Sequence, residues 1–153
     1  MVLVIWNTAY WALNSYALAQ QQESKLKQRK YIKIGDKYAR TLKNMEKVGS
    51  PSAVALVAFL DAERLTCKGK LFKAEKLYRK AIKLLKEGQL YLFEAIACER
   101  LALCLRMPSS DDASNESKSK EALLEAWDKF RVYGANMKLN RMRTDYGEET
   151  FTS

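Results

Sequence analysis

Apolar residues recur every three or four positions along most of this chain, the spacing that places them on one face of an α-helix. The first segment shows this spacing at Trp6, Tyr10 and Leu13. Ala, Leu, Lys, Glu and Arg, all good helix formers, dominate the composition. The sequence therefore predicts an all-α protein. The expected helices cover residues 3–20, 23–48, 52–67, 71–87, 90–106, 117–133 and 136–143.

Short turns separate most of these helices. In the clearest one, Gly49 suits a left-handed cap, Ser50 an N-cap and Pro51 the first helical turn. Consecutive helices joined by such turns pack antiparallel. We therefore expect one domain over residues 1–143. It comprises hairpins at about 3–48, 51–87 and 90–133 and a capping helix at 136–143.

Two segments lack a helical period. Residues 108–117 are rich in Ser and Asp, and we expect a disordered insertion there. Residues 144–153 carry no periodic apolar positions, which predicts a flexible tail.

The second hairpin carries the spacing of a tetratricopeptide repeat: a small and a bulky residue, a turn, then Ala-x-x-x-Tyr-x-x-Ala. The small residues let two helices approach closely, and the bulky ones fill the space beside them. Glu63-Arg64-Leu65 is echoed 36 residues later at Glu99-Arg100-Leu101, close to the period of these repeats. The chain thus resembles an α-solenoid, in which stacked hairpins share a core. The expected repeat core comprises Ala62, Leu65, Ala74, Tyr78, Ala81, Ala126 and Phe130.

Three stretches of sequence indicate a more specific group of helical repeats. They are Asp36-Lys37-Tyr38-Ala39-Arg40, the segment from Lys70 to Ala102, and the segment from Glu121 to Tyr133-Gly134-Ala135-Asn136-Met137-Lys138. With them, residues 35–138 resemble the repeat region that follows the ATPase module in soluble (type 10) adenylate cyclases and in microbial ATPase-linked kinases and cyclases. The resemblance implies a C-terminal regulatory segment of a larger signalling assembly. It also implies a cytoplasmic location, or a ciliary or flagellar one.

Two positions depart from the general repeat. Asp61 stands where an apolar residue is usual, and Ala58 stands where a tryptophan is usual.

The chemistry of catalysis is sparse in this chain. It has no histidine, and neither a phosphate-binding Gly-x-x-x-x-Gly-Lys loop nor a Gly-x-Ser-x-Gly elbow occurs. The spacing of Cys98 and Cys104 matches no zinc pair, and with Cys67 they are interpreted as small buried residues. Glu94 and Glu99 are interpreted as solvated or salt-bridged helix residues. We therefore expect no enzyme activity and no catalytic, cofactor or metal site.

The formal charge of +9 predicts an anionic partner. Two basic strips are candidate partner-binding surfaces. One comprises Lys25, Lys27, Arg29, Lys30, Lys33 and Lys37, and the other Lys73, Lys76, Lys80 and Lys83. Each strip is either a solvated face, a docking site for an acidic protein or another part of an assembly, or a binder of nucleic acid or anionic membrane. The excess of Lys over Arg disfavours base reading in nucleic acid.

The leading hypothesis is a non-catalytic module that holds protein partners. The alternative is a basic, electrostatic binder of nucleic acid or anionic membrane surface.

The first twenty residues allow two interpretations. Ala17-Leu18-Ala19 is similar to a signal-peptidase site, but no Lys or Arg precedes the apolar stretch, and Asn7 and Asn14 interrupt it. We expect a buried first helix, with a cleaved targeting segment of a secreted protein as the alternative.

Overall fold

The computed structural model describes residues 2–108 and 112–152, and within them it contains helices but no strand. The elements are α1 (Val2–Gln20), α2 (Lys25–Lys47), α3 (Pro51–Cys67), α4 (Leu71–Glu87), α5 (Tyr91–Leu105), α6 (Asp112–Tyr133), α7 (Asn136–Tyr146) and the short 3-10 helix η1 (Glu148–Thr150). The predicted all-α class is confirmed.

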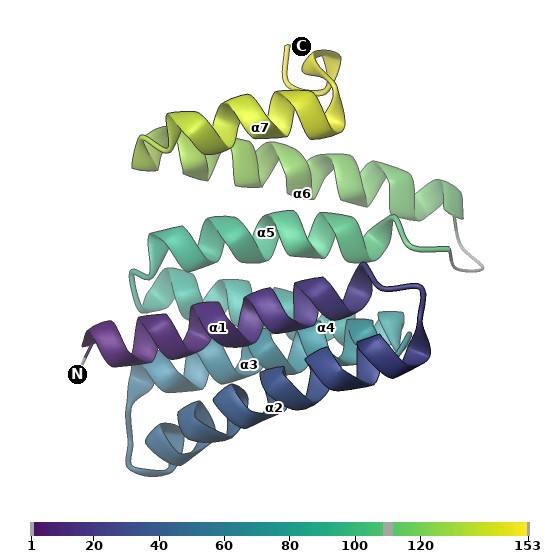
Figure 1. Ribbon diagram of the computed structural model, residues 1–153. Coiled ribbons are helices and arrows are strands. Elements are labelled where there is room, and N and C mark those ends of the chain that lie inside the picture. The colour runs from purple at the N-terminus through teal and green to yellow at the C-terminus, as the bar shows by residue number, and fades with distance from the viewer. Residues whose placement is uncertain (1, 109–111, 153) are drawn as a thin grey trace.

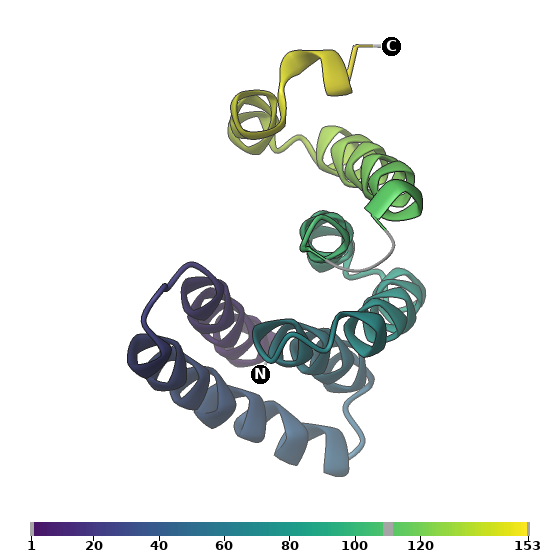
Figure 2. The same ribbon diagram turned by 90° about the vertical axis from the view of Figure 1, so that its right-hand side faces the viewer.

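Consecutive helices lie side by side and antiparallel, with α2 near one end of the stack and α7 near the other (Figure 1). The most extensive contacts join α1 to α2, α3 to α4 and α5 to α6, as in three helical hairpins. Further contacts of α3 with α1 and α2, and of α4 with α5, hold the hairpins together. Seen nearly end-on, the helices follow a curve that is open on one side, and α1, α5 and α7 border the opening (Figure 2).

The turns form where the sequence places their signals. Gly49 has a φ of +87°, a conformation that side chains other than glycine rarely adopt. The hydroxyl of Ser50 accepts a hydrogen bond from the Ala53 amide at 3.4 Å, and Pro51 occupies the first helical turn. Gly69 repeats the positive φ between α3 and α4.

The expected repeat core lies almost wholly inside the stack. Ala62, Ala74, Ala81 and Ala126 are fully buried, which allows the close approach of their helices. Leu65 differs from its expected role, because it is only partly buried at the edge of the core. The bulky members of the core, Tyr78 and Phe130, are also buried.

Gly35 has a packing role in the middle of α2. Glycine within a helix costs about 1 kcal/mol relative to alanine. Here the ring of Tyr16 from α1 packs directly onto the glycine, and an added Cβ would lie 2.6 Å from the Tyr16 Cε1 atom. The missing side chain therefore makes room for a fully buried tyrosine.

The expected disordered insertion at 108–117 is wrong for residues 112–117, because α6 already begins at Asp112. Residues 109–111 lie outside the described part of the chain. A tertiary contact that leaves no periodic signal anchors the start of this helix. The buried hydroxyl of Ser119 donates to the Ala102 carbonyl at 2.9 Å and accepts from Arg106 Nε at 3.0 Å.

The expected flexible tail at 144–153 is also wrong for its described residues. Helix α7 continues to Tyr146, and η1 follows it. The Phe151 ring stacks on Trp127 of α6, with ring centroids 4.4 Å apart. This stacking and the hydrogen bond from the Tyr146 hydroxyl to Glu99 of α5 hold the tail against the stack.

One face of α1 packs against the neighbouring helices, while its other face is exposed. Ala9, Ala12 and Tyr16 are fully buried against the neighbouring helices. None of the helices in the described ranges has the length and apolar character needed to cross a membrane.

Candidate functional site

Three carboxylates link neighbouring helices. Each one accepts a hydrogen bond from a tyrosine hydroxyl and from a cationic side chain. We call these sets the carboxylate triads. They comprise Tyr16–Asp36–Arg64, Tyr78–Glu63–Arg100 and Tyr146–Glu99–Lys138.

The first triad joins α1, α2 and α3. The Tyr16 hydroxyl donates to Asp36 Oδ1 at 2.8 Å, and Arg64 donates through Nε to Oδ1 at 2.7 Å and through Nη2 to Oδ2 at 3.1 Å. The two-pronged geometry fixes the orientation of both side chains.

The second triad is the most deeply buried, since the Glu63 side chain is 0% exposed. The Tyr78 hydroxyl donates to Glu63 Oε1 at 2.6 Å. Arg100 donates through Nε to Oε1 at 2.8 Å and through Nη2 to Oε2 at 3.0 Å. Gln20 completes the set, because its amide nitrogen donates to Glu63 at 3.0 Å and its oxygen accepts from Arg100 at 2.8 Å. This network joins α1, α3, α4 and α5.

The third triad joins α5 to α7. Lys138 Nζ lies 2.7 Å from Glu99 Oε2, and the Tyr146 hydroxyl donates to Oε1 at 2.9 Å. Of the two interpretations of Glu99, solvated or salt-bridged, the second is correct, and the ion pair is buried on the Glu99 side. Glu94 is likewise buried and paired, with Lys129 Nζ at 2.9 Å.

The triads repeat along the stack. Arg64 and Arg100 stand 36 residues apart, and each binds a carboxylate of the preceding hairpin or helix. The Glu-Arg sequence that recurs after 36 residues therefore supplies an arginine each time to an ion pair between helices. The carboxylate partners, Asp36 and Glu63, lie far from these arginines in the chain. Among the described residues, no buried side-chain nitrogen or oxygen lacks a hydrogen-bond partner.

Burial and the neighbouring carboxylates change the protonation of the tyrosines. Burial, followed by the adjacent carboxylate, raises the pKa of Tyr16, Tyr78 and Tyr146 above the usual value of about 10. Burial alone would raise the pKa of Asp36, but the hydrogen bonds from Arg64 and Tyr16 outweigh it and lower that pKa. Folding therefore favours neutral triad tyrosines, and in the first triad it favours the ionised form of Asp36.

A groove lies on the open side of the curve, between α1, α5 and α7 (Figure 2). Its volume is about 500 Å³. Both apolar side chains and charged or amide groups line it. The lining residues are Tyr10, Leu13, Asn14, Ala17, Leu92, Ile96, Glu99, Arg100, Leu103, Phe130, Ala135, Lys138, Arg141, Asp145 and Tyr146. Members of two triads thus form part of the groove, which we call the inner groove.

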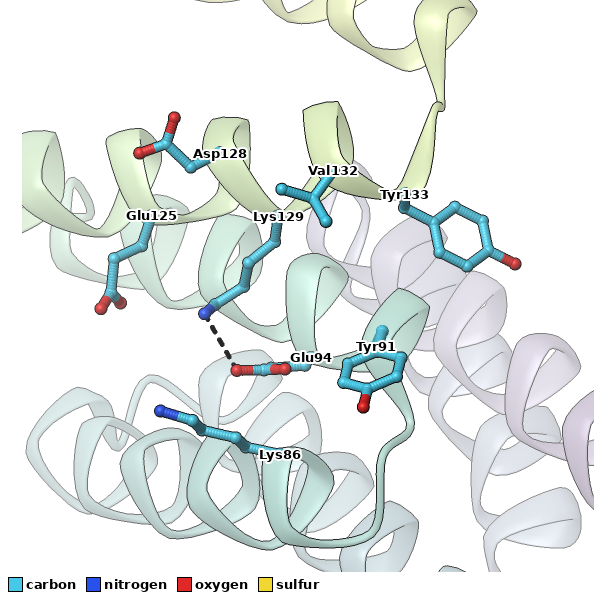
Figure 3. Close-up of a pocket in the computed structure, with 8 residues that line it drawn as sticks. All are labelled: Lys86, Tyr91, Glu94, Glu125, Asp128, Lys129, Val132 and Tyr133. Atoms are coloured by element: carbon cyan, nitrogen blue, oxygen red, sulfur yellow. Dashed lines mark ion pairs between the residues drawn. The ribbon is translucent and has the colours of Figure 1, made fainter.

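A second hollow, the side pocket, lies over α5 between the end of α4 and the outer side of α6 (Figure 3). Its volume is about 500 Å³. The Glu94–Lys129 ion pair lies at its centre, and Tyr91, Val132 and Tyr133 border one end. All three of these bordering side chains are exposed.

The predicted basic strips are exposed but do not form one surface. Helix α3 separates the α2 strip, with Lys25, Arg29 and Lys33, from the α4 strip (Figure 1). The α4 strip contains Lys73, Lys76, Lys80 and Lys83, all exposed. Two of them have local contacts within the helix. Lys76 lies over the Phe72 ring at 4.5 Å, and Lys83 lies 4.0 Å from Glu87.

The three cysteines are free thiols that burial makes less acidic. Burial raises the pKa of Cys67 to about 11 and that of Cys98 to about 12, and it also raises the pKa of Cys104. A protonated thiol is a poor nucleophile. Within residues 2–108 and 112–152, no group of three or more Cys, Asp or Glu side chains is placed to hold a metal ion.

No protein-family model matches the chain, and neither a curated protein nor a solved structure is significantly similar to it. The geometry of the groove, the pocket and the triads is therefore the basis for a functional proposal. The triads and the inner groove were not predicted from the sequence, because each combines residues of different helices that lie far apart in the chain.

The triads predict alkaline sensitivity. The unfolded chain releases tyrosine protons from about pH 10, whereas Tyr16, Tyr78 and Tyr146 keep theirs in the folded state. Their contribution to stability is thus complete below pH 10 and is lost as the pH rises through their higher folded values. Urea unfolding at a series of pH values should show the free energy of unfolding starting to fall above about pH 8.5, where the thiols of the unfolded chain titrate, and falling more steeply above about pH 10, where its tyrosines do.

The variant Tyr146→Phe is the control for this prediction, because it removes one of the three triad tyrosines and leaves the other titrating groups in place. Its decline above pH 10 should be shallower than that of the unmodified protein. An identical decline in both proteins would contradict the role given to the triad tyrosines.

Proposed function

We propose that this protein is a non-catalytic interaction module that holds a segment of a partner protein in the inner groove. The observation that carries the proposal is the lining of that groove, which combines apolar side chains with charged and amide groups. Such a mixture suits a polypeptide, whose side chains need apolar contacts and whose backbone needs hydrogen-bond partners.

The triads support this proposal by holding part of the groove rigid. Arg100 is bound by Glu63 and Gln20, and Lys138 is bound by Glu99. Side chains already fixed in the free protein lose little conformational entropy when a partner binds. The free polar groups at the rim, such as Asn14, remain available to the partner.

The resemblance to the repeat region of soluble adenylate cyclases extends the proposal. In this view the module works within a larger, cytoplasmic signalling assembly, whose other domains or subunits supply the bound segment. The enzymatic activity of such an assembly would reside in those other parts.

A bulky side chain inside the groove should remove the partner. Asn14 is an exposed groove residue, so Asn14→Trp should block the groove without disturbing the core. The matched control is Asn44→Trp, which places the same ring on the exposed face of α2. Proteins captured from an extract of the native cells are compared by quantitative mass spectrometry. We expect at least one protein to be retained by the control and lost from the groove variant.

Identical sets of captured proteins with both variants would contradict the inner groove as the binding surface. Circular dichroism spectra equal to that of the unmodified protein confirm that both variants are folded.

We infer a second candidate function, electrostatic binding of an anionic surface, from the α4 strip. Lys73 and Lys80 are exposed and have no ion-pair partner within the described residues. Lysines held in water at helical spacing attract any polyanion, and such binding weakens steeply as salt rises.

This second candidate predicts binding to a DNA duplex of arbitrary sequence and to vesicles containing phosphatidylserine. Reversing the strip with Lys73→Glu, Lys76→Glu, Lys80→Glu and Lys83→Glu should weaken that binding at least tenfold, measured by fluorescence anisotropy and by vesicle sedimentation. Unchanged affinity after the fourfold reversal would refute this function while leaving the inner groove untested by the same result.

A further inference from the structure

The outward face of α6 carries an acidic stripe that ends in an exposed apolar residue. Glu121, Glu125 and Asp128 follow one another at intervals of four and three residues, and Val132 comes four residues later. All four side chains are exposed, Val132 at 86%. Intervals of three and four keep them on one face of the helix. On a chain with a net charge of +9, this stripe is a local concentration of negative charge.

The outward face of α2 carries the opposite charges at the same intervals. Leu26 is 79% exposed, and Lys30, Lys33 and Lys37 follow it at intervals of four, three and four residues. These three lysines form no ion pair within the described part of the chain. The stripe on α2 therefore begins with its apolar residue, whereas the stripe on α6 ends with one.

The two stripes match when the helices run antiparallel. Leu26 then lies opposite Val132, Lys30 opposite Asp128 and Lys33 opposite Glu125. The last pair is Lys37 with Glu121. Eleven residues separate the first and last members of each stripe, about 16 Å of helix. Charge and apolar character are thus complementary at every position.

Each apolar residue also has a hollow to enter. The side pocket beside Val132 is bordered by Tyr91 and Tyr133 (Figure 3). The surface around Leu26 forms a hollow of about 940 Å³ that includes Ile32 and Ile34. A leucine from α2 fits the first hollow, and a valine from α6 fits the second.

The two stripes cannot meet within one molecule. Helix α2 lies near one end of the stack and α6 toward the other, and the two are not among the helix pairs in contact (Figure 1). We propose that α2 of one copy of this protein docks antiparallel on α6 of a second copy. The two surfaces of this contact differ, so each copy keeps one free stripe. A contact of this kind joins molecules head to tail into rings or open chains.

The contact rests mainly on exposed ion pairs, which are individually weak. Asp128 also has a competing local partner, Arg131 at 3.3 Å. We therefore expect weak self-association that appears only at high protein concentration. This contact goes beyond the proposed function, because it leaves the inner groove free.

Two charge-reversed variants test the contact by sedimentation velocity over a range of protein concentrations. The acid-reversed variant carries Glu121→Lys, Glu125→Lys and Asp128→Lys. The base-reversed variant carries Lys30→Glu, Lys33→Glu and Lys37→Glu. The unmodified protein should self-associate, and each variant alone should associate at least tenfold more weakly because its two stripes then have like charges.

An equimolar mixture of the two variants should associate again. The lysines on α2 of one variant then face the glutamates of α6 on the other, and the reversed stripes face each other in the same way. Recovery in the mixture also shows that both variants are folded. The matched control carries Lys73→Glu, Lys76→Glu and Lys80→Glu on α4, which changes the net charge by the same amount as the base-reversed variant but should leave association unchanged.

Three results would overturn the proposal. They are a protein that stays monomeric at the highest concentration reached, variants that associate as strongly as the unmodified protein, and a mixture that remains as dissociated as its components. None of these results bears on the inner groove, whose own test uses Asn14→Trp.

Discussion

A carboxylate sealed from water is stable only where cations and hydrogen-bond donors surround it, and Glu63 meets this requirement with side chains from three other helices. Removal from water would otherwise cost several kcal/mol. The folded state must therefore keep Arg100, Tyr78 and Gln20 in place around it. Because these residues belong to α5, α4 and α1, the charge of Glu63 on α3 fixes the positions of these three helices relative to α3 and to one another.

The same constraint shapes the exposed surfaces. Arg100 and Lys138 border the inner groove, and the carboxylates beneath them fix their orientation. The groove is thus rigid where the triads reach it and adaptable at its rim. The lysines and acids that make no such contacts remain on the outer faces of α2, α4 and α6, where they are available to other molecules.

The helices and the hairpin order could be predicted from the sequence because helical spacing and turn residues are local signals. Their spacing predicts that Ala62, Ala74 and Tyr78 are buried, and all three lie in the core. The triads could not be predicted in the same way, since Glu63 and Arg100 are 37 residues apart and resemble ordinary surface residues in the sequence. The ordered tail escaped prediction for a similar reason, because it depends on contacts with residues far away in the chain, such as those of Phe151 with Trp127 and of Tyr146 with Glu99.

The most direct measurement is the free energy of unfolding of Arg100→Met in urea, beside the exposed-arginine control Arg40→Met and the double variant Glu63→Gln/Arg100→Met. Leaving Glu63 buried without its cation should cost about 3–5 kcal/mol. The exposed control Arg40→Met should lose far less, and the double variant should regain much of the loss because its buried group is neutral. If Arg100→Met were no less stable than the control, the buried charge would not hold these helices together.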